Sequence, residues 1–133
     1  MYDADSDKPV VIVADDDPTM RRVFSRALVA TGYQVLLAMN VEEAMEYLRY
    51  PNVRAVVLDM LFVNSGGKSG LDVLEFIRSE QSLGDLPVIV VTGFPLNRSV
   101  TQRVEGLRAE IWSKPFELAK LTERVGELVL RQS

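Results

Sequence analysis

The sequence predicts an α/β fold, a doubly wound, five-stranded parallel sheet with helices on both faces. Five short apolar runs alternate strictly with segments whose apolar residues recur at helical spacing. Val10–Ala14, the first run, is apolar at every position, which is typical of a strand buried on both faces. Strict alternation of strand and helix favours parallel strands joined by crossover helices. Sheets of this kind bind their ligands at the carboxyl ends of the strands.

The first strand precedes a helix with a marked start and end. Asp17 is a good N-cap residue, and Pro18 after it suits the first helical position. Apolar residues at positions 20, 23, 24, 27 and 28 form one helical face, and Gly32 ends the helix. The four later strands are expected at Gln34–Ala38, Ala55–Leu58, Pro87–Val91 and Ile111–Trp112.

The four later helices are expected from apolar residues at helical spacing. Asn40 and Glu43 resemble a capping box at the start of the second helix, and Pro51 closes it. A stretch rich in glycine and serine, residues 64–70, precedes the third helix. The apolar faces of these helices are Val41, Ala44, Met45 and Leu48; Leu71, Leu74 and Ile77; Val100, Val104 and Leu107; and Leu118, Leu121, Val125 and Leu128.

Composition excludes several classes of function. The chain has 133 residues, enough for one domain, and its net charge of −4 gives no support for direct nucleic-acid binding or an anionic membrane surface. It has no cysteine and no histidine, which excludes disulfides and histidine acid–base catalysis. Residues 1–8 are largely polar and acidic, so we expect a flexible tail, not a signal peptide, ahead of one domain over residues 9–133. No apolar run approaches the ~20 residues of a membrane span, and the expected location is the cytoplasm.

Acids, a hydroxyl and an amine follow the expected strands. Asp15–Asp17 come after the first strand, Asp59 after the third, Thr92 after the fourth and Lys114 after the fifth. Clustered carboxylates repel one another, and Mg²⁺ relieves this repulsion. A lysine and a threonine can bind phosphoryl oxygens, and a carboxylate can itself accept a phosphoryl group. Each residue alone fits a cap or a turn, but the combination predicts an aspartate phosphorylation site.

Four segments, Val13–Arg21, Leu58–Met60, Val90–Gly93 and Lys114–Phe116, together resemble the receiver domain of two-component response regulators. The resemblance covers roughly Pro9 to Leu130. It implies a flavodoxin-like sheet of strand order 2-1-3-4-5 with five flanking helices. It also implies a signalling switch, not a turnover enzyme, which acts through phosphorylation.

The resemblance assigns the phosphoacceptor and the metal ligands. Asp59 would take the phosphoryl group from the phosphohistidine of a sensor kinase. Mg²⁺ would be held by Asp15, Asp16, Asp59 and the backbone carbonyl of Leu61. The expected partners are therefore a sensor histidine kinase or phosphotransfer protein and a downstream protein or output domain. No output domain follows in this sequence, so a lone receiver and a fragment of a longer regulator both stay open.

The resemblance also assigns the switch. Thr92 and Lys114 would bind the phosphoryl group and shift the surface of the fourth helix, fifth strand and fifth helix, where homodimerisation stays open. Ile111 stands where the family has its aromatic switch residue, and Trp112 beside it should point to the opposite face. The family's Lys-Pro bond is typically cis, which implies the same for Lys114-Pro115.

Two further departures from the family concern the rim of the site. The loop Phe62–Ser69 is about three residues longer than usual, because Gly70 follows Asp59 by eleven positions and not eight. Leu61 and Phe94 are apolar at positions that flank the phosphoryl group. We expect these two side chains to slow attack by water and to prolong the phosphorylated state.

Three alternatives remain. In a phosphatase of the haloacid dehalogenase type, Asp15 would be the nucleophile and Asp17 the acid–base, but Asp59 would have no role and the later acidic pair is missing. In a nucleotide-binding protein, Gly67-Lys68-Ser69 would belong to a phosphate loop, but Phe62 stands where that motif needs its first glycine. In a degenerate receiver, the fold would serve only as a binding module.

Overall fold

The five predicted strands form one parallel sheet of order β2-β1-β3-β4-β5, as the resemblance implied. The computed structural model describes residues 2–60, 67–93 and 95–131. The strands are β1 (Val10–Ala14), β2 (Gln34–Ala38), β3 (Val53–Asp59), β4 (Val88–Thr92) and β5 (Glu110–Ser113). The helices are α1 (Pro18–Ala30), α2 (Val41–Tyr47), α3 (Gly70–Ser79), α4 (Arg98–Gly106) and α5 (Leu118–Leu130), with a short 3₁₀ helix, η1 (Gln81–Leu83).

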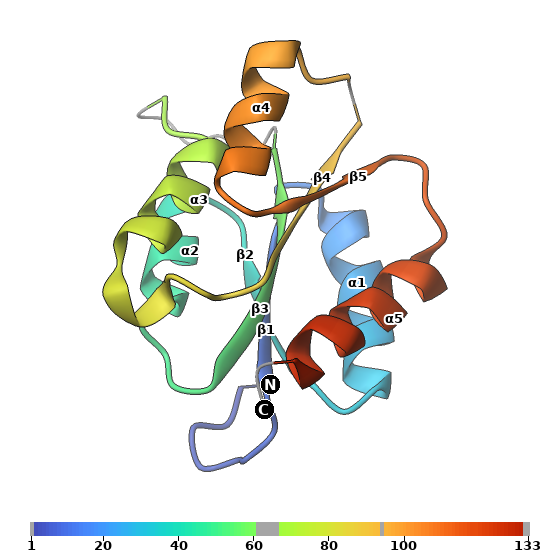
Figure 1. The fold of residues 1–133 in the computed structure, drawn as a ribbon. Helices are drawn as coiled ribbons and strands as arrows, with labels where there is room; N and C mark the ends of the chain where they lie inside the picture. The colour runs from blue at the N-terminus through green and yellow to red at the C-terminus, as the bar shows by residue number, and fades with distance from the viewer. Residues whose placement is uncertain (1, 61–66, 94, 132–133) are drawn as a thin grey trace.

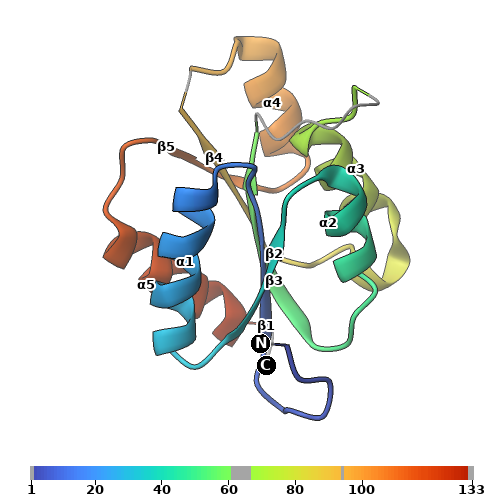
Figure 2. The same cartoon turned by 180° about the vertical axis from the view of Figure 1, so that it is seen from behind.

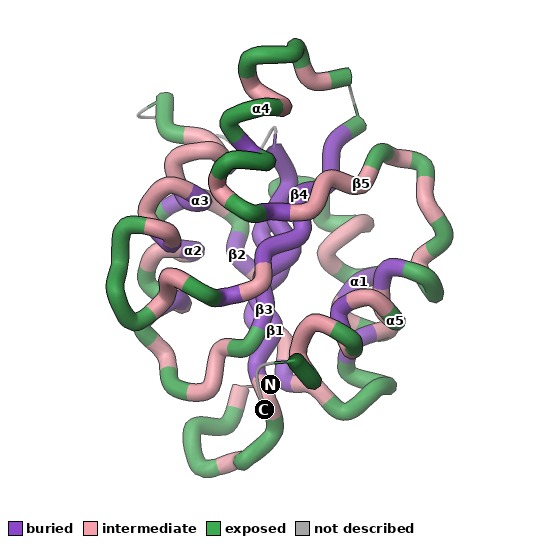
Figure 3. Tube along the Cα trace, viewed as in Figure 1, coloured by how far each residue is buried: buried purple, intermediate pink, exposed green. Residues whose placement is uncertain are grey.

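The sheet separates two apolar cores. Helices α1 and α5 cover one face, and α2, α3 and α4 cover the other (Figures 1 and 2). Alternate residues of β1 enter different cores, Val11 and Val13 beside α1 and α5, and Ile12 on the other side. The buried residues accordingly gather along the strands (Figure 3). None of the described helices combines the length and hydropathy of a transmembrane segment.

The predicted helix starts are confirmed by their caps. The Asp17 carboxylate accepts a hydrogen bond from the Thr19 backbone N–H at 2.9 Å. The Asn40 side chain accepts one from the Glu43 N–H at 2.8 Å. The Glu43 carboxylate reaches back one residue further than a capping box requires, to the Met39 N–H at 2.7 Å. These side chains satisfy backbone donors that the first helical turn leaves without partners.

Three strands extend beyond their predicted ends into the polar residues at the carboxyl edge. Asp59 and Thr92 are the last residues of β3 and β4, whereas the sequence placed them after the strands. The ladder continues because it needs only backbone groups: the Met60 N–H donates to the Val91 carbonyl at 3.0 Å, and the Lys114 N–H to the Thr92 carbonyl at 2.8 Å. The polar side chains are therefore held by the rigid sheet.

Gly70 lies against the end of β3, where α3 begins. A Cβ atom at this position would stand 2.6 Å from the Asp59 carbonyl oxygen and 3.2 Å from the Met60 Cα. Both neighbours are backbone atoms, so they cannot rotate away as a side chain could. Glycine at position 70 therefore allows α3 to start directly beside Asp59.

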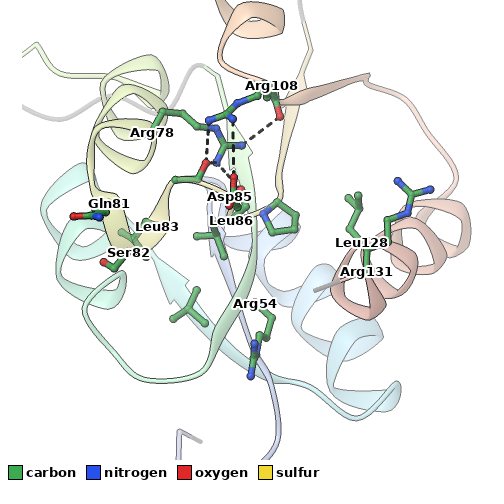
Figure 4. A pocket seen from close by; sticks show the side chains of 13 residues that line it. Arg54, Arg78, Gln81, Ser82, Leu83, Asp85, Leu86, Arg108, Leu128 and Arg131 are labelled. Atoms are coloured by element: carbon green, nitrogen blue, oxygen red, sulfur yellow. Dashed lines mark hydrogen bonds and ion pairs between the residues drawn. The ribbon is translucent and has the colours of Figure 1, made fainter. Parts of the chain in front are cut away.

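Arg78 fastens the far end of α3 to two loops at the amino-terminal edge of the sheet (Figure 4). Its guanidinium donates to the carbonyls of Leu107 at 2.6 Å, Leu86 at 2.7 Å, Gly84 at 3.1 Å and Arg108 at 3.3 Å. Burial is the main cause that lowers the pKa of Arg78, and the neighbouring Arg108 adds to it. Four carbonyl acceptors compensate this burial of a charged group.

These loops border an open cavity of about 690 Å³. Arg54 and Arg131 also line it but lie apart from the Arg78–Arg108 pair in Figure 4. The Arg108 side chain donates to the Gly84 carbonyl at 3.0 Å and lies 4.0 Å from the Asp85 carboxylate. The arginines at the centre of this cavity are therefore engaged in joining loops.

Residues 2–8 lie beside the amino-terminal edge of the sheet. The Asp3 N–H donates to the Gln34 side chain at 2.6 Å, and the Asn52 side chain donates to the Lys8 carbonyl at 2.8 Å. The Tyr2 and Tyr50 rings lie 5.0 Å apart. The expected flexibility of residues 1–8 stays a prediction, because these contacts do not measure motion.

Candidate functional site

Strands β1, β3 and β5 bring three charged side chains together at the carboxyl edge of the sheet. The Lys114 ammonium lies 3.5 Å from a carboxylate oxygen of Asp59 and 3.7 Å from one of Asp15. Both aspartates are buried, while the Lys114 side chain is about a quarter exposed. These distances join residues that are far apart in the sequence, as the parallel topology predicted.

A cluster of three carboxylates forms the floor of this site. Oxygens of Asp15, Asp16 and Asp59 lie within 4.8 Å of one another. Asp15 is 1% exposed and Asp59 6% exposed, whereas Asp16 is exposed and opens the cluster to solvent. Among the described residues, the buried Oδ2 of Asp15 accepts no hydrogen bond. Carboxylate oxygens are the ligands that Mg²⁺ prefers, and a buried oxygen without a hydrogen bond can serve as one.

Asp15 has a raised pKa in this cluster. Burial raises the pKa of Asp15 from 3.8 to about 6. The hydrogen bond from the Asp17 N–H opposes this shift, the Asp59 carboxylate adds to it, and the Lys114 ammonium opposes it. A divalent cation would favour the ionised form in the same way as Lys114, with a larger charge.

Thr92 ends β4, and Lys114 directly follows β5, the next strand across the sheet. Thr92 is buried, and the Lys114 N–H donates to its carbonyl at 2.8 Å. Val91, the residue before Thr92, is the register partner of Asp59. The Lys114–Pro115 bond is cis, as the resemblance implied. The Thr92 and Lys114 side chains therefore come from the carboxyl ends of the two strands that follow β3 across the sheet.

Ile111 and Trp112 face opposite sides of the sheet, as strand alternation predicted. Ile111 packs against the core below α2, α3 and α4. Trp112 packs in the other core, with its ring 6.1 Å from the Phe116 ring. The position of the family's aromatic switch thus holds an aliphatic side chain. The only tryptophan of the chain lies on the opposite face of the sheet, beside α1 and α5.

Several predicted features of the rim fall outside the described residues. They include Leu61, whose carbonyl was expected to hold the metal, Phe94, and most of the loop Phe62–Ser69. The carbonyl ligand, the coverage of the site by this loop and the slowing of hydrolysis by Leu61 and Phe94 stay predictions.

Arg21 contributes a contact that the sequence did not reveal. From the first turns of α1, its guanidinium Nη1 donates to the Asp15 carbonyl at 2.9 Å. The Asp17 N–H donates to the Asp15 carboxylate at 2.9 Å and holds the other side of the same residue. Arg21 follows Asp17 by one helical turn, a spacing that allows a long side chain to reach back, but spacing alone did not identify the acceptor.

The geometry disfavours two of the alternatives. Asp17, the acid–base of the phosphatase hypothesis, is exposed, caps α1 and is not a member of the three-carboxylate cluster. Ser69, the last residue of the phosphate-loop hypothesis, donates its N–H to the Asp72 carboxylate at 2.6 Å and so closes a capping box at the start of α3. An acid in this place opposes a bound phosphate.

Comparison with known proteins identifies the family of the chain. The family model of the response regulator receiver domain matches residues 11–126. A response regulator MprA from Mycobacterium sp. (strain KMS) is 37% identical over 127 residues, which are 92% of this chain and 51% of that protein. The MprA of Mycobacterium leprae (strain TN) is 36% identical over 125 residues, with coverages of 91% and 51%. The chain thus spans about half the length of the curated relatives it matches.

Solved structures agree on the fold. A response regulator receiver protein from Pseudomonas putida superposes with a TM-score of 0.80 at 30% identity, covering 92% of this chain and 98% of that one. A CheY-like receiver domain protein from Methanospirillum hungatei JF-1 superposes with a TM-score of 0.81 at 22% identity, covering 96% and 97%.

Proposed function

Because the chain belongs to the response regulator receiver domain family, we propose that it accepts a phosphoryl group on Asp59 in a Mg²⁺-dependent reaction. One observation carries the proposal: the buried Asp59 carboxylate lies among Asp15, Asp16 and Lys114 within salt-bridge and metal-ligand distances. This is the charge environment that an incoming phosphoryl group requires.

The acids of the site would hold the metal ion. Asp15, Asp16 and Asp59 would bind Mg²⁺, with the Leu61 carbonyl as a further ligand. A cation held there would supply positive charge to offset that of the phosphoryl oxygens. Asp15 sits at the base of the cluster and Asp16 at its exposed side, so the donor enters past Asp16.

The chemical step is a transfer between two nucleophiles. One Asp59 oxygen attacks phosphorus, and the bond from phosphorus to the histidine nitrogen of the donor, or to the acyl oxygen of acetyl phosphate, breaks. The product is an acyl phosphate. The Lys114 ammonium, 3.5 Å from the Asp59 carboxylate, shifts its ion pair to the new phosphoryl oxygens.

The phosphoryl group then biases a two-state equilibrium. Thr92 and Lys114 contact it in only one of the states, and differential contacts of this kind are what a switch needs. Thr92 precedes α4 along the chain, and Lys114 lies between β5 and α5, so we propose the surface of α4, β5 and α5 as the output. Ile111 replaces the aromatic switch residue within it.

The natural context is proposed from the family. The proposed donor is a sensor histidine kinase or a phosphotransfer protein. The receptor of the signal is a downstream protein or output domain. We place the receiver domain at residues 9–133, behind a flexible tail, and in the cytoplasm, and regard it as a signalling switch with self-phosphorylation and self-dephosphorylation only.

Intact mass after incubation with Mg²⁺ and acetyl phosphate tests the proposal. The expected result is one added phosphoryl group, which is lost without Mg²⁺ and lost in Asp59→Asn. Labelling that survives Asp59→Asn and disappears in Asp15→Asn would favour the phosphatase alternative. No labelling of the wild-type chain, with Mg²⁺ binding shown separately, would favour a degenerate receiver.

A further inference from the structure

We propose that Arg21 is a positioning residue, which fixes the backbone of the Asp15–Asp17 loop and so orients Asp16 toward the metal ion. The inference rests on the proposed function, because it concerns the Mg²⁺ site of the same reaction. It assigns a role to a side chain that lies outside the carboxylate, threonine and lysine groups of that site.

Arg21 holds both ends of the loop. Its guanidinium donates to the Asp15 carbonyl at 2.9 Å, and its own backbone N–H donates to the Asp17 carbonyl at 3.0 Å. The side chain is half-buried, so water competes weakly for this charge-assisted bond. The side chain of Arg21 thereby holds the peptide that joins Asp15 to Asp16, while its backbone N–H holds the carbonyl of Asp17 at the start of α1.

Asp16 depends on this support more than Asp15 does. Asp15 is held by the sheet through its N–H to the Ala38 carbonyl at 3.2 Å, by the Asp17 N–H on its carboxylate and by burial. Asp16 is exposed, and the peptide that joins it to Asp15 is the one whose carbonyl Arg21 binds. Outer contacts that orient metal ligands are commonly worth 10–100-fold in metal affinity.

Charge alone predicts the opposite effect on the metal. A guanidinium beside three carboxylates repels a divalent cation, so its removal should tighten Mg²⁺ binding if Arg21 acts only as a charge. If Arg21 acts by positioning, its removal should weaken Mg²⁺ binding. The sign of the change therefore separates the two interpretations.

Arg22 provides a matched control. It is the next residue of α1, carries the same charge and is exposed, and its side chain forms no hydrogen bond or ion pair with the residues that the structure describes. The substitution Arg22→Ala removes one positive charge from the same helix turn without touching the loop.

The experiment is a calorimetric titration of the full chain with Mg²⁺ alone, without any phosphodonor. We expect Arg21→Ala to weaken binding by about tenfold. Arg22→Ala should leave it within about twofold or tighten it slightly, since only a screened charge is lost. Arg21→Lys should restore part of the loss, because the ammonium can still donate to the Asp15 carbonyl.

Phosphorylation by acetyl phosphate gives a second readout. In Arg21→Ala the Mg²⁺ concentration for half-maximal rate should rise by the same factor, while the rate at saturating Mg²⁺ stays within about twofold of the wild type. A general disturbance of the fold would lower the saturated rate as well.

The inference is overturned if Arg21→Ala binds Mg²⁺ as tightly as the wild type or more tightly, or if Arg21→Ala and Arg22→Ala change it equally. Should Arg21→Ala fail to fold by circular dichroism, Arg21→Gln and Arg21→Lys decide, with lysine expected to bind Mg²⁺ better than glutamine. A wild-type chain that binds no Mg²⁺ overturns the proposed function, and this inference with it.

Discussion

The substitution Asp15→Asn should stabilise the Mg²⁺-free protein at neutral pH, although it removes a residue of the proposed metal site. Asp15 is buried, and its pKa rises from 3.8 to about 6 on folding, chiefly through burial. Between these values the folded state binds more protons than the unfolded state, so the free energy of unfolding falls as pH rises. Above pH 6 the full cost of the buried charge is present.

The magnitude follows from the shift. A change from 3.8 to about 6 corresponds to about 3 kcal/mol of destabilisation at neutral pH. Near pH 4.5, where the folded carboxyl is largely protonated, the same relation leaves about 1 kcal/mol. The asparagine side chain of the variant carries no charge at either pH, so the gain in stability should shrink on acidification.

Urea unfolding followed by circular dichroism measures the difference in free energy of unfolding between wild type and Asp15→Asn at neutral pH and near pH 4.5. Asp16→Asn is the matched control, since that acid is exposed and its replacement should change Mg²⁺-free stability little. Saturating Mg²⁺ should stabilise the wild type and reverse the order of wild type and Asp15→Asn. An Asp15→Asn chain that is less stable than the wild type without Mg²⁺, or equally changed at both pH values, would refute the reasoning.

Three further substitutions test the framework of the site. Gly70→Ala should lower the free energy of unfolding by roughly 1–3 kcal/mol, since its Cβ would meet the Asp59 carbonyl at 2.6 Å. Gly106→Ala is the control and should not lower it, because a Cβ there meets open space. Urea unfolding measures both variants. Arg78→Ala should lower the free energy of unfolding by roughly 2–4 kcal/mol in the same assay, because four carbonyls lose their donor. A smaller loss than that of Arg103→Ala, which removes an exposed arginine, would contradict this. Asp17→Ala should cost about 1 kcal/mol as a lost helix cap and leave phosphorylation intact, and loss of labelling would revive its proposed role as an acid–base.

The sequence predicted the sheet and the site because both depend on local patterns. The fully apolar run of β1 and the Asp17-Pro18 cap identify their elements without reference to the rest of the chain. Parallel topology then brings the residues after each strand to one edge, which is why Asp15, Asp59 and Lys114 could be grouped.

Contacts between distant backbone and side-chain atoms could not be predicted in this way. Arg21 has several allowed rotamers, and its acceptor is a carbonyl that no sequence pattern marks. The requirement for glycine at position 70 arises from its approach to Asp59 across a long loop, and the ends of β3 and β4 depend on backbone pairing with their neighbours. These features are consequences of packing.

Phosphorylation of Asp59 is tested most directly by identifying the phosphorylated residue chemically. The chain is treated with acetyl phosphate and Mg²⁺, reduced with borohydride, which converts an aspartyl phosphate to homoserine, and digested for peptide sequencing. We predict homoserine at position 59 alone, and none when Mg²⁺ is withheld. Homoserine at position 15 or 16, or none at position 59 in a chain that binds Mg²⁺, would contradict it.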